Sequence, residues 1–196
     1  IKDAGKQQLI SPTSYVIFSY EPRTGKEIWR GVHGSYSPAS RPIFGNGLLY
    51  VPTGRGKSEL WAIRPNGQGD ITETHIAWKI EGASVPQEPS ALCVDSLLYL
   101  VSNSGEASCI DSATGEVLWS ERLGGNYVAS PIYAGGHLYF ANVQGKTTVV
   151  KPGRTFEAVG INTLDEGMLA SPAAVGNALF LRTKTHLYRM EAGAGE

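Results

Sequence analysis

The sequence predicts an all-β fold, a β-propeller made of four-stranded antiparallel blades, and two repeated anchors predict it. The first anchor is a short strand, a tight turn on Gly, Asn or Asp, and a second strand that ends in an aromatic residue. This aromatic residue recurs at positions 50, 99, 139 and 180, at spacings of 49, 40 and 41 residues. A period near 40 residues with four short strands in each unit is typical of a propeller blade rather than of a helical solenoid.

The second anchor is a Thr-Gly turn followed by a tryptophan. Residues 24–29 (Thr-Gly-Lys-Glu-Ile-Trp) and 114–119 (Thr-Gly-Glu-Val-Leu-Trp) are near copies, Trp78 fills the same position in the second unit, and Val159 fills it in the weakest copy. The aromatic-to-tryptophan distance is 20 residues in the third and fourth units and 28 in the second. About eight extra residues therefore lie in the stretch 64–73. Counting back 20 residues from Trp29 reaches Leu9, which extends the register to the start of the chain.

One unit illustrates the expected blade. Residues 91–94 form the inner strand A, 97–102 strand B, 107–111 strand C and 117–122 the outer strand D. Strand A is small and apolar because inner strands crowd around a central channel. The ring of Trp119 buries on the order of 150–250 Å² and packs between neighbouring blades, since a lone sheet face would stay wet.

The register predicts a single propeller segment over residues 1–190 in an incomplete ring. Its blades lie at about 1–30, 41–80, 90–123, 130–163 and 171–190, the last with three strands, and residues 191–196 form a flexible tail. Unpaired sheet edges invite pairing. A homodimer through the open blade edges is therefore one hypothesis for a partner.

The pattern Asp-x-x-Thr-Gly-(Glu/Lys)-x-x-Trp at residues 111–119 resembles the tryptophan-docking motif of the pyrroloquinoline-quinone-repeat, or quinoprotein-like, propellers. Glu21 stands at the Asp position of the first copy. The resemblance implies a blade-docking role for five residues: Trp29, Trp78, Trp119, Gly25 and Gly115. Because members have seven or eight blades, it also implies that this chain is the C-terminal portion of a larger propeller. The motif identifies the blade and leaves the activity open.

Composition excludes several classes of function. The formal net charge is −1, and the 17 basic residues are spread along the chain, so no nucleic-acid footprint is present. No apolar run approaches the ~20 residues of a membrane span.

No catalytic or metal-ligating constellation is found in the sequence. The four histidines form no ligand pair, and Gly54–Ser58 lacks the first glycine of a phosphate-binding loop. Asn66–Asp70 lacks the alternating acids and the terminal bidentate Glu of a calcium loop and is interpreted as a solvated turn. A quinone site is not expected, because the sequence has no adjacent cysteine pair. Cys93 and Cys109 are placed on strands A and C of one blade, about 9.6 Å apart, and are predicted to be free and largely buried.

A ligand or partner is expected on the face formed by the D–A and B–C loops, which this family uses for binding. The D–A loops are residues 31–41, 81–90, 124–130 and 165–171. The candidate residues are His33, Tyr36, Arg41, Arg55, Lys57, Gln87, Glu88, Tyr127 and Met168. Against this stands the simpler interpretation that these polar residues only hydrate a rim.

The sequence therefore predicts a non-enzymatic binding or scaffolding module without a cofactor, and the resemblance implies an extracytoplasmic location. Two alternatives stay open: a fragment of a quinone-dependent dehydrogenase, and the sensor domain of a larger signalling protein. The sequence names neither a protein nor a small-molecule partner.

Overall fold

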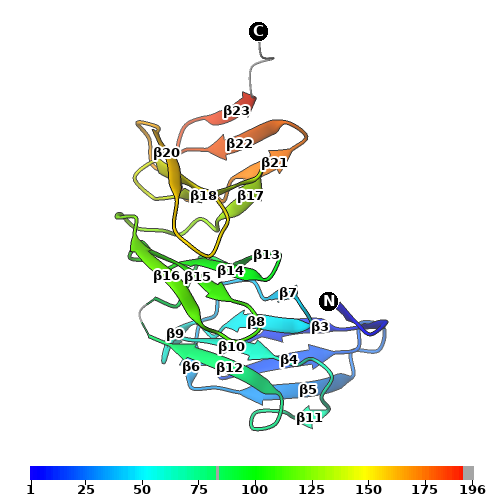
Figure 1. Ribbon diagram of the computed structural model, residues 1–196. Coiled ribbons are helices and arrows are strands. Elements are labelled where there is room, and N and C mark those ends of the chain that lie inside the picture. Colours follow the sequence, from blue (N-terminus) through cyan, green and yellow to red (C-terminus); the bar gives the residue numbers. More distant parts are fainter. Residues whose placement is uncertain (83, 192–196) are drawn as a thin grey trace.

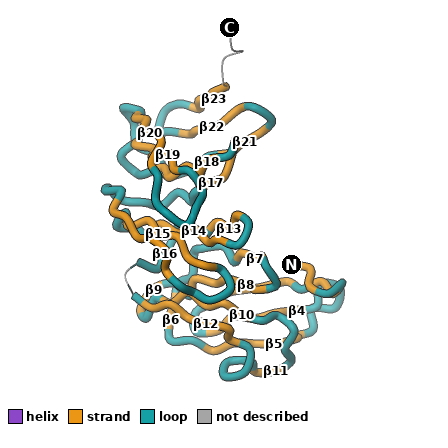
Figure 2. The backbone as a smooth tube through the Cα atoms, in the orientation of Figure 1, coloured by secondary structure: helices purple, strands orange, loops and turns teal. Residues whose placement is uncertain are grey.

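The computed structural model describes residues 1–82 and 84–191. It is an all-β arrangement of consecutive antiparallel sheets that fan out along the chain without closing into a ring (Figure 1). The sheets follow one another in sequence order, from the N-terminal sheet to the C-terminal one. Every described element is a strand, a turn or a loop, as Figure 2 makes visible. The predicted incomplete propeller is confirmed.

Three central sheets have the same A-B-C-D order. They are β7(Ile43–Gly45), β8(Leu48–Pro52), β10(Glu59–Ile63) and β12(Ile76–Glu81); β13(Leu92–Val94), β14(Leu97–Val101), β15(Glu106–Asp111) and β16(Val117–Arg122); and β17(Ile132–Ala134), β18(His137–Ala141), β19(Lys146–Val150) and β20(Ala158–Thr163). The last sheet has three strands, β21(Ala173–Val175), β22(Ala178–Arg182) and β23(Leu187–Glu191). Glu191 thus ends a strand instead of starting a tail, and the rest of the predicted flexible tail, 192–196, lies outside the described residues.

The first blade is less regular. The hairpin β1(Lys2–Asp3) and β2(Lys6–Gln7) supplies its inner part, and β3(Leu9–Pro12), β4(Val16–Tyr20) and β5(Glu27–Val32) complete it. Ile10 pairs with Ser19, which pairs with Trp29, just as Tyr99 pairs with Cys109 and Cys109 with Trp119. Ile10, one residue after Leu9, therefore takes the aromatic position.

The insertion in the second unit forms a strand of its own. β11(Gly69–Asp70) pairs in parallel with β5 of the first blade, Gly69 opposite Trp29. Ile71 follows it into the core and is fully buried. The predicted solvated turn at Asn66–Asp70 is thus partly a strand that joins the second blade to the outer edge of the first.

The hydrophobic cores lie between blades. Blades 3 and 4 share a core in which the face of β14 that carries Tyr99 packs against Leu138 and Phe140 of β18. Similar clusters join blades 1 and 2, blades 2 and 3, and blades 4 and 5. The alternation of side chains along each strand makes this possible, because successive side chains point to opposite faces of the sheet. One face then packs against the preceding blade and the other against the following blade.

The tryptophan rings sit in these interblade cores. Trp78 Nε1 donates to the carbonyl oxygen of Ser112 in the next blade at 3.1 Å, and Trp119 Nε1 donates to that of Gly153 at 3.1 Å. Trp29 reaches the second blade through a relay: its Nε1 donates to Gln8 Oε1 at 2.9 Å, and Gln8 Nε2 donates to the carbonyl of Pro65 at 2.8 Å.

The fourth blade departs from the pattern, and the expectation for Val159 is wrong by one residue. Val149, which pairs with Tyr139, lies opposite Gly160. Gly160 therefore occupies the tryptophan position, and Val159 points to the other side of β20 and is 48% exposed. A cavity of about 70 Å³ lies between blades 4 and 5, lined by residues that include Tyr139, Asn162 and Leu179.

Candidate binding face

The loops that join successive strands divide between two faces of the fan. One, here called the loop face, carries the D–A loops and the B–C loops at residues 53–58, 102–105, 142–145 and 183–186; the other, here called the turn face, carries the A–B and C–D turns. The B–C loops are tight, and their backbone bonds back to the adjoining D–A loops. Leu123 N–H, for example, donates to the carbonyl of Gly105 at 2.8 Å, and Leu164 N–H to that of Gly145 at 3.0 Å.

Side-chain bonds between neighbouring loops hold this face together. Asn103 Oδ1 accepts from the N–H of Gln87 at 3.0 Å, and Asn103 Nδ2 donates to the carbonyl of Tyr127 at 3.2 Å. In the last blade the hydroxyls of Thr183 and Thr185 bond the Glu166 carboxylate and lower its pKa to about 2. The loops therefore form a fixed platform.

Four of the expected face residues gather around a short strand pair, β6(Ser35–Tyr36) with β9(Arg55–Gly56). Arg55 forms an ion pair with Glu88 at 2.8 Å, which joins the B–C loop of the second blade to the D–A loop that follows it. The amide of Gln87 donates to Ser58 Oγ at 3.2 Å. Tyr36 is 47% exposed and lies against Gly56, where a Cβ would come within 3.0 Å of the Tyr36 ring. These residues form one continuous surface.

Lys57 belongs to the same cluster but is engaged in its own network. Its ammonium bridges Glu59 at 3.0 Å and Glu81 at 2.9 Å. Glu59 is buried and also accepts from Trp61 Nε1 at 3.0 Å. Burial opposes ionisation of Glu59, but the bonds from Lys57 and Trp61 outweigh it and lower the carboxyl pKa. Lys57 is thus the counter-ion of a buried carboxylate, and its charge is not available to a partner.

Three of the expected residues lie in the interior. His33 packs edge-on against Trp61, with 5.9 Å between ring centroids, and is 7% exposed. Tyr127 is fully buried, which raises the pKa of its phenol to about 12, and Met168 packs into the core between blades 4 and 5. These side chains support the loops instead of offering a surface.

Arg41 stands apart, at the entry to the inner strand of the second blade. Its side chain is exposed, and its N–H donates to Ser90 Oγ at 2.8 Å.

The loop face also contains a hollow that the sequence did not indicate, of about 190 Å³ in the last blade. It is lined by residues 167, 169–170 and 182–184, among them Leu169, which is 59% exposed, and the cations Arg182 and Lys184. The one available signal in the sequence was a leucine, Leu169, inside a D–A loop.

The titratable groups that the sequence singled out do not converge. Within residues 1–82 and 84–191 no three His, Cys, Asp or Glu side chains are grouped to hold a metal ion. Cys93 and Cys109 are both free, as predicted, although Cys93 is only half-buried. Burial raises the pKa of the Cys109 thiol to about 11. No helix among the described residues is long and apolar enough to cross a membrane.

Comparison with known protein families shows to which family this fold belongs. A family model described as outer membrane protein assembly factor BamB matches residues 13–159. The chain belongs to this family. Its quinoprotein-like repeats are those that the resemblance at residues 111–119 indicated.

Solved structures agree with the BamB-type fold. The crystal structure of BamB from Moraxella catarrhalis matches with a TM-score of 0.76 and 16% sequence identity, over 100% of this chain and 58% of that one. A computationally designed protein, Ika8, matches with a TM-score of 0.69 and 13% identity, over 93% of this chain and 57% of that one. At these identities the likeness shows the fold alone. The chain spans less than two thirds of either structure, and no curated protein matches it.

Proposed function

We propose that this chain is a non-enzymatic scaffold that acts outside the cytoplasm and binds a protein partner on its loop face. The observation that carries the proposal is the platform around Tyr36, Arg55 and Glu88, where an exposed aromatic ring and a charged pair sit on loops that hydrogen bonds hold in place. Aromatic and arginine side chains on rigid supports are typical of protein-binding surfaces. The family description, an outer-membrane assembly factor, supports both the class of partner and the location.

Site-specific photo-crosslinking tests this proposal. A photoreactive residue at Tyr36 or Leu169, on the loop face, is expected to capture a component of the outer-membrane assembly machinery, whereas one at Glu116, on the turn face, is not. Purified components of that machinery then give the affinity, which we expect Tyr36→Ala with Arg55→Glu to weaken at least tenfold, about the effect of losing one binding hot spot. Equal capture from both faces, or unchanged affinity of the double variant, would overturn the proposed face.

A quinone-dependent dehydrogenase fragment is the enzymatic alternative. The residues do not favour it, because the two cysteines are not adjacent in the sequence and the described carboxylates do not group as a metal site. Titration with quinone and Ca²⁺, followed by visible absorbance, separates the two functions. A saturable spectral change at micromolar protein would favour the dehydrogenase. The sensor alternative needs sequence beyond this chain.

Pairing of two copies through the end sheets is proposed as a second property of the scaffold. Val175 occupies the position in the last blade that Val94 occupies in blade 3. Val94 packs against the next blade, whereas Val175 is 66% exposed. At the other end, Leu9 pairs with Tyr20 as the buried Leu98 pairs with Ile110, yet Leu9 is 57% exposed. Both faces therefore carry the apolar residues that elsewhere form interblade cores.

A further inference from the structure

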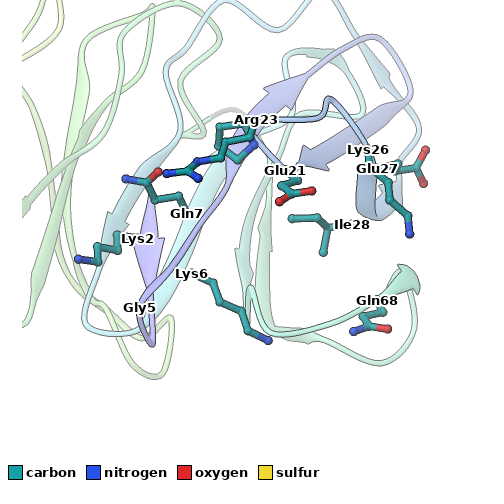
Figure 3. A pocket seen from close by; sticks show the side chains of 11 residues that line it. Lys2, Gly5, Lys6, Gln7, Glu21, Arg23, Lys26, Glu27, Ile28 and Gln68 are labelled. Atoms are coloured by element: carbon teal, nitrogen blue, oxygen red, sulfur yellow. The ribbon is translucent and has the colours of Figure 1, made fainter.

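A large hollow lies on the turn face, away from the proposed partner platform. It has a volume of about 730 Å³ and lies against the first blade (Figure 3). This volume is in the range of ligand pockets for small molecules. Three separate segments line it: the hairpin β1–β2, the C–D turn of the first blade with the start of β5 (residues 21–28), and Gln68 from the insertion of the second blade.

The insertion is what brings Gln68 to this place. Blades 3 and 4 have no insertion, and their C–D turns connect directly. Because β11 pairs with β5, the preceding residue Gln68 is held beside the strand that carries Ile28. The hollow is therefore a local feature of the first two blades.

The lining is rich in cations. Lys2, Lys6, Arg23 and Lys26 line the hollow, and none of these four forms an ion pair with another described residue. Figure 3 shows Lys6 and Lys26 extending toward the opening from opposite sides, while Arg23 reaches from the turn toward the strand of Gln7. Lys2 lies at the rim, on the outer side of the hairpin.

The two carboxylates in the lining are already engaged. Glu27 pairs with Arg30, which lies outside the lining, through two bonds of 2.7 and 3.0 Å, and Glu21 accepts from Thr24 Oγ1 at 2.5 Å. Counting four cations against two carboxylates gives the lining a formal charge of +2, while the whole chain carries −1. The lining of this hollow is thus positive, although the whole chain is slightly acidic.

We propose that this hollow binds the phosphate groups of a multiply charged anion. Lys6, Arg23 and Lys26 supply the charge, and the side-chain amides of Gln7 and Gln68 supply further donors at the walls. Arginine and lysine together are the usual phosphate-binding side chains, since the guanidinium donates in a fixed fork and the ammonium acts as a point charge. Ile28 gives the hollow an apolar floor, which suits an organic group attached to the phosphate.

Isothermal titration with inorganic pyrophosphate at low ionic strength tests the proposal. We expect saturable binding to one site and a steep loss of affinity as salt rises toward 0.5 M, because salt screens exposed charges. The double variant Lys6→Gln, Arg23→Gln is expected to bind at least tenfold more weakly, since charge-assisted hydrogen bonds are lost. The variant Lys151→Gln, Arg154→Gln removes the same two charges from the fourth blade, and its affinity should stay unchanged.

Two further experiments identify the source of the phosphate and the specificity of the hollow for phosphate over other anions. Vesicles that contain phosphatidylglycerol, compared with neutral vesicles, report whether a lipid headgroup supplies it, and soluble pyrophosphate alone reports a free ligand. Citrate should bind more weakly than pyrophosphate. Absence of pyrophosphate binding, equal loss in both double variants, or tighter binding of citrate would each overturn the proposal. All variants are first compared by circular dichroism, so that a folding defect is recognised as such.

Discussion

The N–H of Ser130 donates a hydrogen bond of 2.9 Å to the hydroxyl of Ser171, the residue at the same position one blade further on. The same bond joins Ser90 to Ser130 at 2.9 Å and Arg41 to Ser90 at 2.8 Å. The inner strands of blades 2, 3 and 4 are therefore each preceded by a residue whose N–H is satisfied by the next blade. This chain of bonds ties the blades together near the centre of the fan, where the inner strands converge.

Loss of one hydroxyl from this series of hydrogen bonds should lower the stability of the protein. Ser130→Ala removes the acceptor of the partly buried Ser90 N–H, and we expect a fall of about 1 kcal/mol in the free energy of unfolding. Urea denaturation followed by tryptophan fluorescence measures it. Ser171→Ala is the control, because its bond is exposed and water replaces the lost acceptor. An equal effect of the two substitutions would contradict the role of burial.

The packing of tryptophan on glycine between blades can be isolated with a matched pair of glycines. Gly25 and Gly115 occupy the same turn position, with φ of +69° and +78°. A Cβ at Gly115 would lie 2.8 Å from the Trp78 ring, whereas one at Gly25 would meet nothing within 4 Å. Gly25→Ala should therefore cost about 1–2 kcal/mol from backbone strain alone. Gly115→Ala should cost at least about 1 kcal/mol more, from overpacking.

Thermal or urea unfolding of both glycine variants gives the comparison. The Trp78 emission should shift to longer wavelength only in Gly115→Ala, because only there is the indole displaced from the next blade. Equal destabilisation of the two variants would mean that the contact between Trp78 and Gly115 contributes nothing to blade docking.

Because His33 is buried, we expect the protein to lose stability in mild acid. Burial lowers the pKa of His33 from 6.5, although the nearby Glu59 carboxylate opposes the shift, and its Nδ1 accepts from the Ser35 N–H at 3.1 Å. The neutral ring is thus the folded form. The unfolded chain takes up the proton first, so the free energy of unfolding decreases as pH falls below about 6.5 and levels off below the folded pKa.

Unfolding curves between pH 7.5 and pH 4.5 for the wild type and His33→Leu test this expectation. The variant should lose the part of the pH dependence below about 6.5, while His137→Gln, a histidine in another blade, should keep it. If the wild type and His33→Leu have parallel pH profiles, His33 does not titrate in this range.

The end sheets predict a dimer. Light scattering on a gel-filtration peak should give a mass near twice 21.0 kDa. Leu187→Glu, at a position that is 71% exposed on the C-terminal sheet, should convert the dimer to monomer, because a charge would be buried without a partner. Val117→Glu, at an equally apolar position that is 50% exposed within the array, should leave the mass unchanged. A monomeric wild type would contradict the pairing.

Strand positions in the middle of the array could be predicted from the sequence, because the turn chemistry and the alternation of apolar residues are local. The strands expected at 91–94, 97–102, 107–111 and 117–122 differ from the observed ones by one residue at most. The free state of Cys93 and Cys109 followed from the same register, since one strand lies between them. The tryptophan position of the fourth blade was missed by one residue, because the connection between its strands C and D is one residue longer. Val149 and its partner Gly160 are 11 residues apart, whereas Cys109 and Trp119 are 10 apart, and no indole marks the shift.

The sequence by itself therefore determined the repeat, the blade and the family, all of which depend on short-range patterns. Only the tertiary structure decided which loop residues form a surface. His33, Tyr127 and Met168 are buried by neighbouring blades, whereas Tyr36, Arg55 and Glu88 meet because loops 33 residues apart lie side by side. The same holds for the hollow of Lys6, Arg23 and Gln68, which come together because β11 pairs with a strand of the preceding blade. Contacts between blades join residues tens of positions apart, and a local pattern carries no information about them.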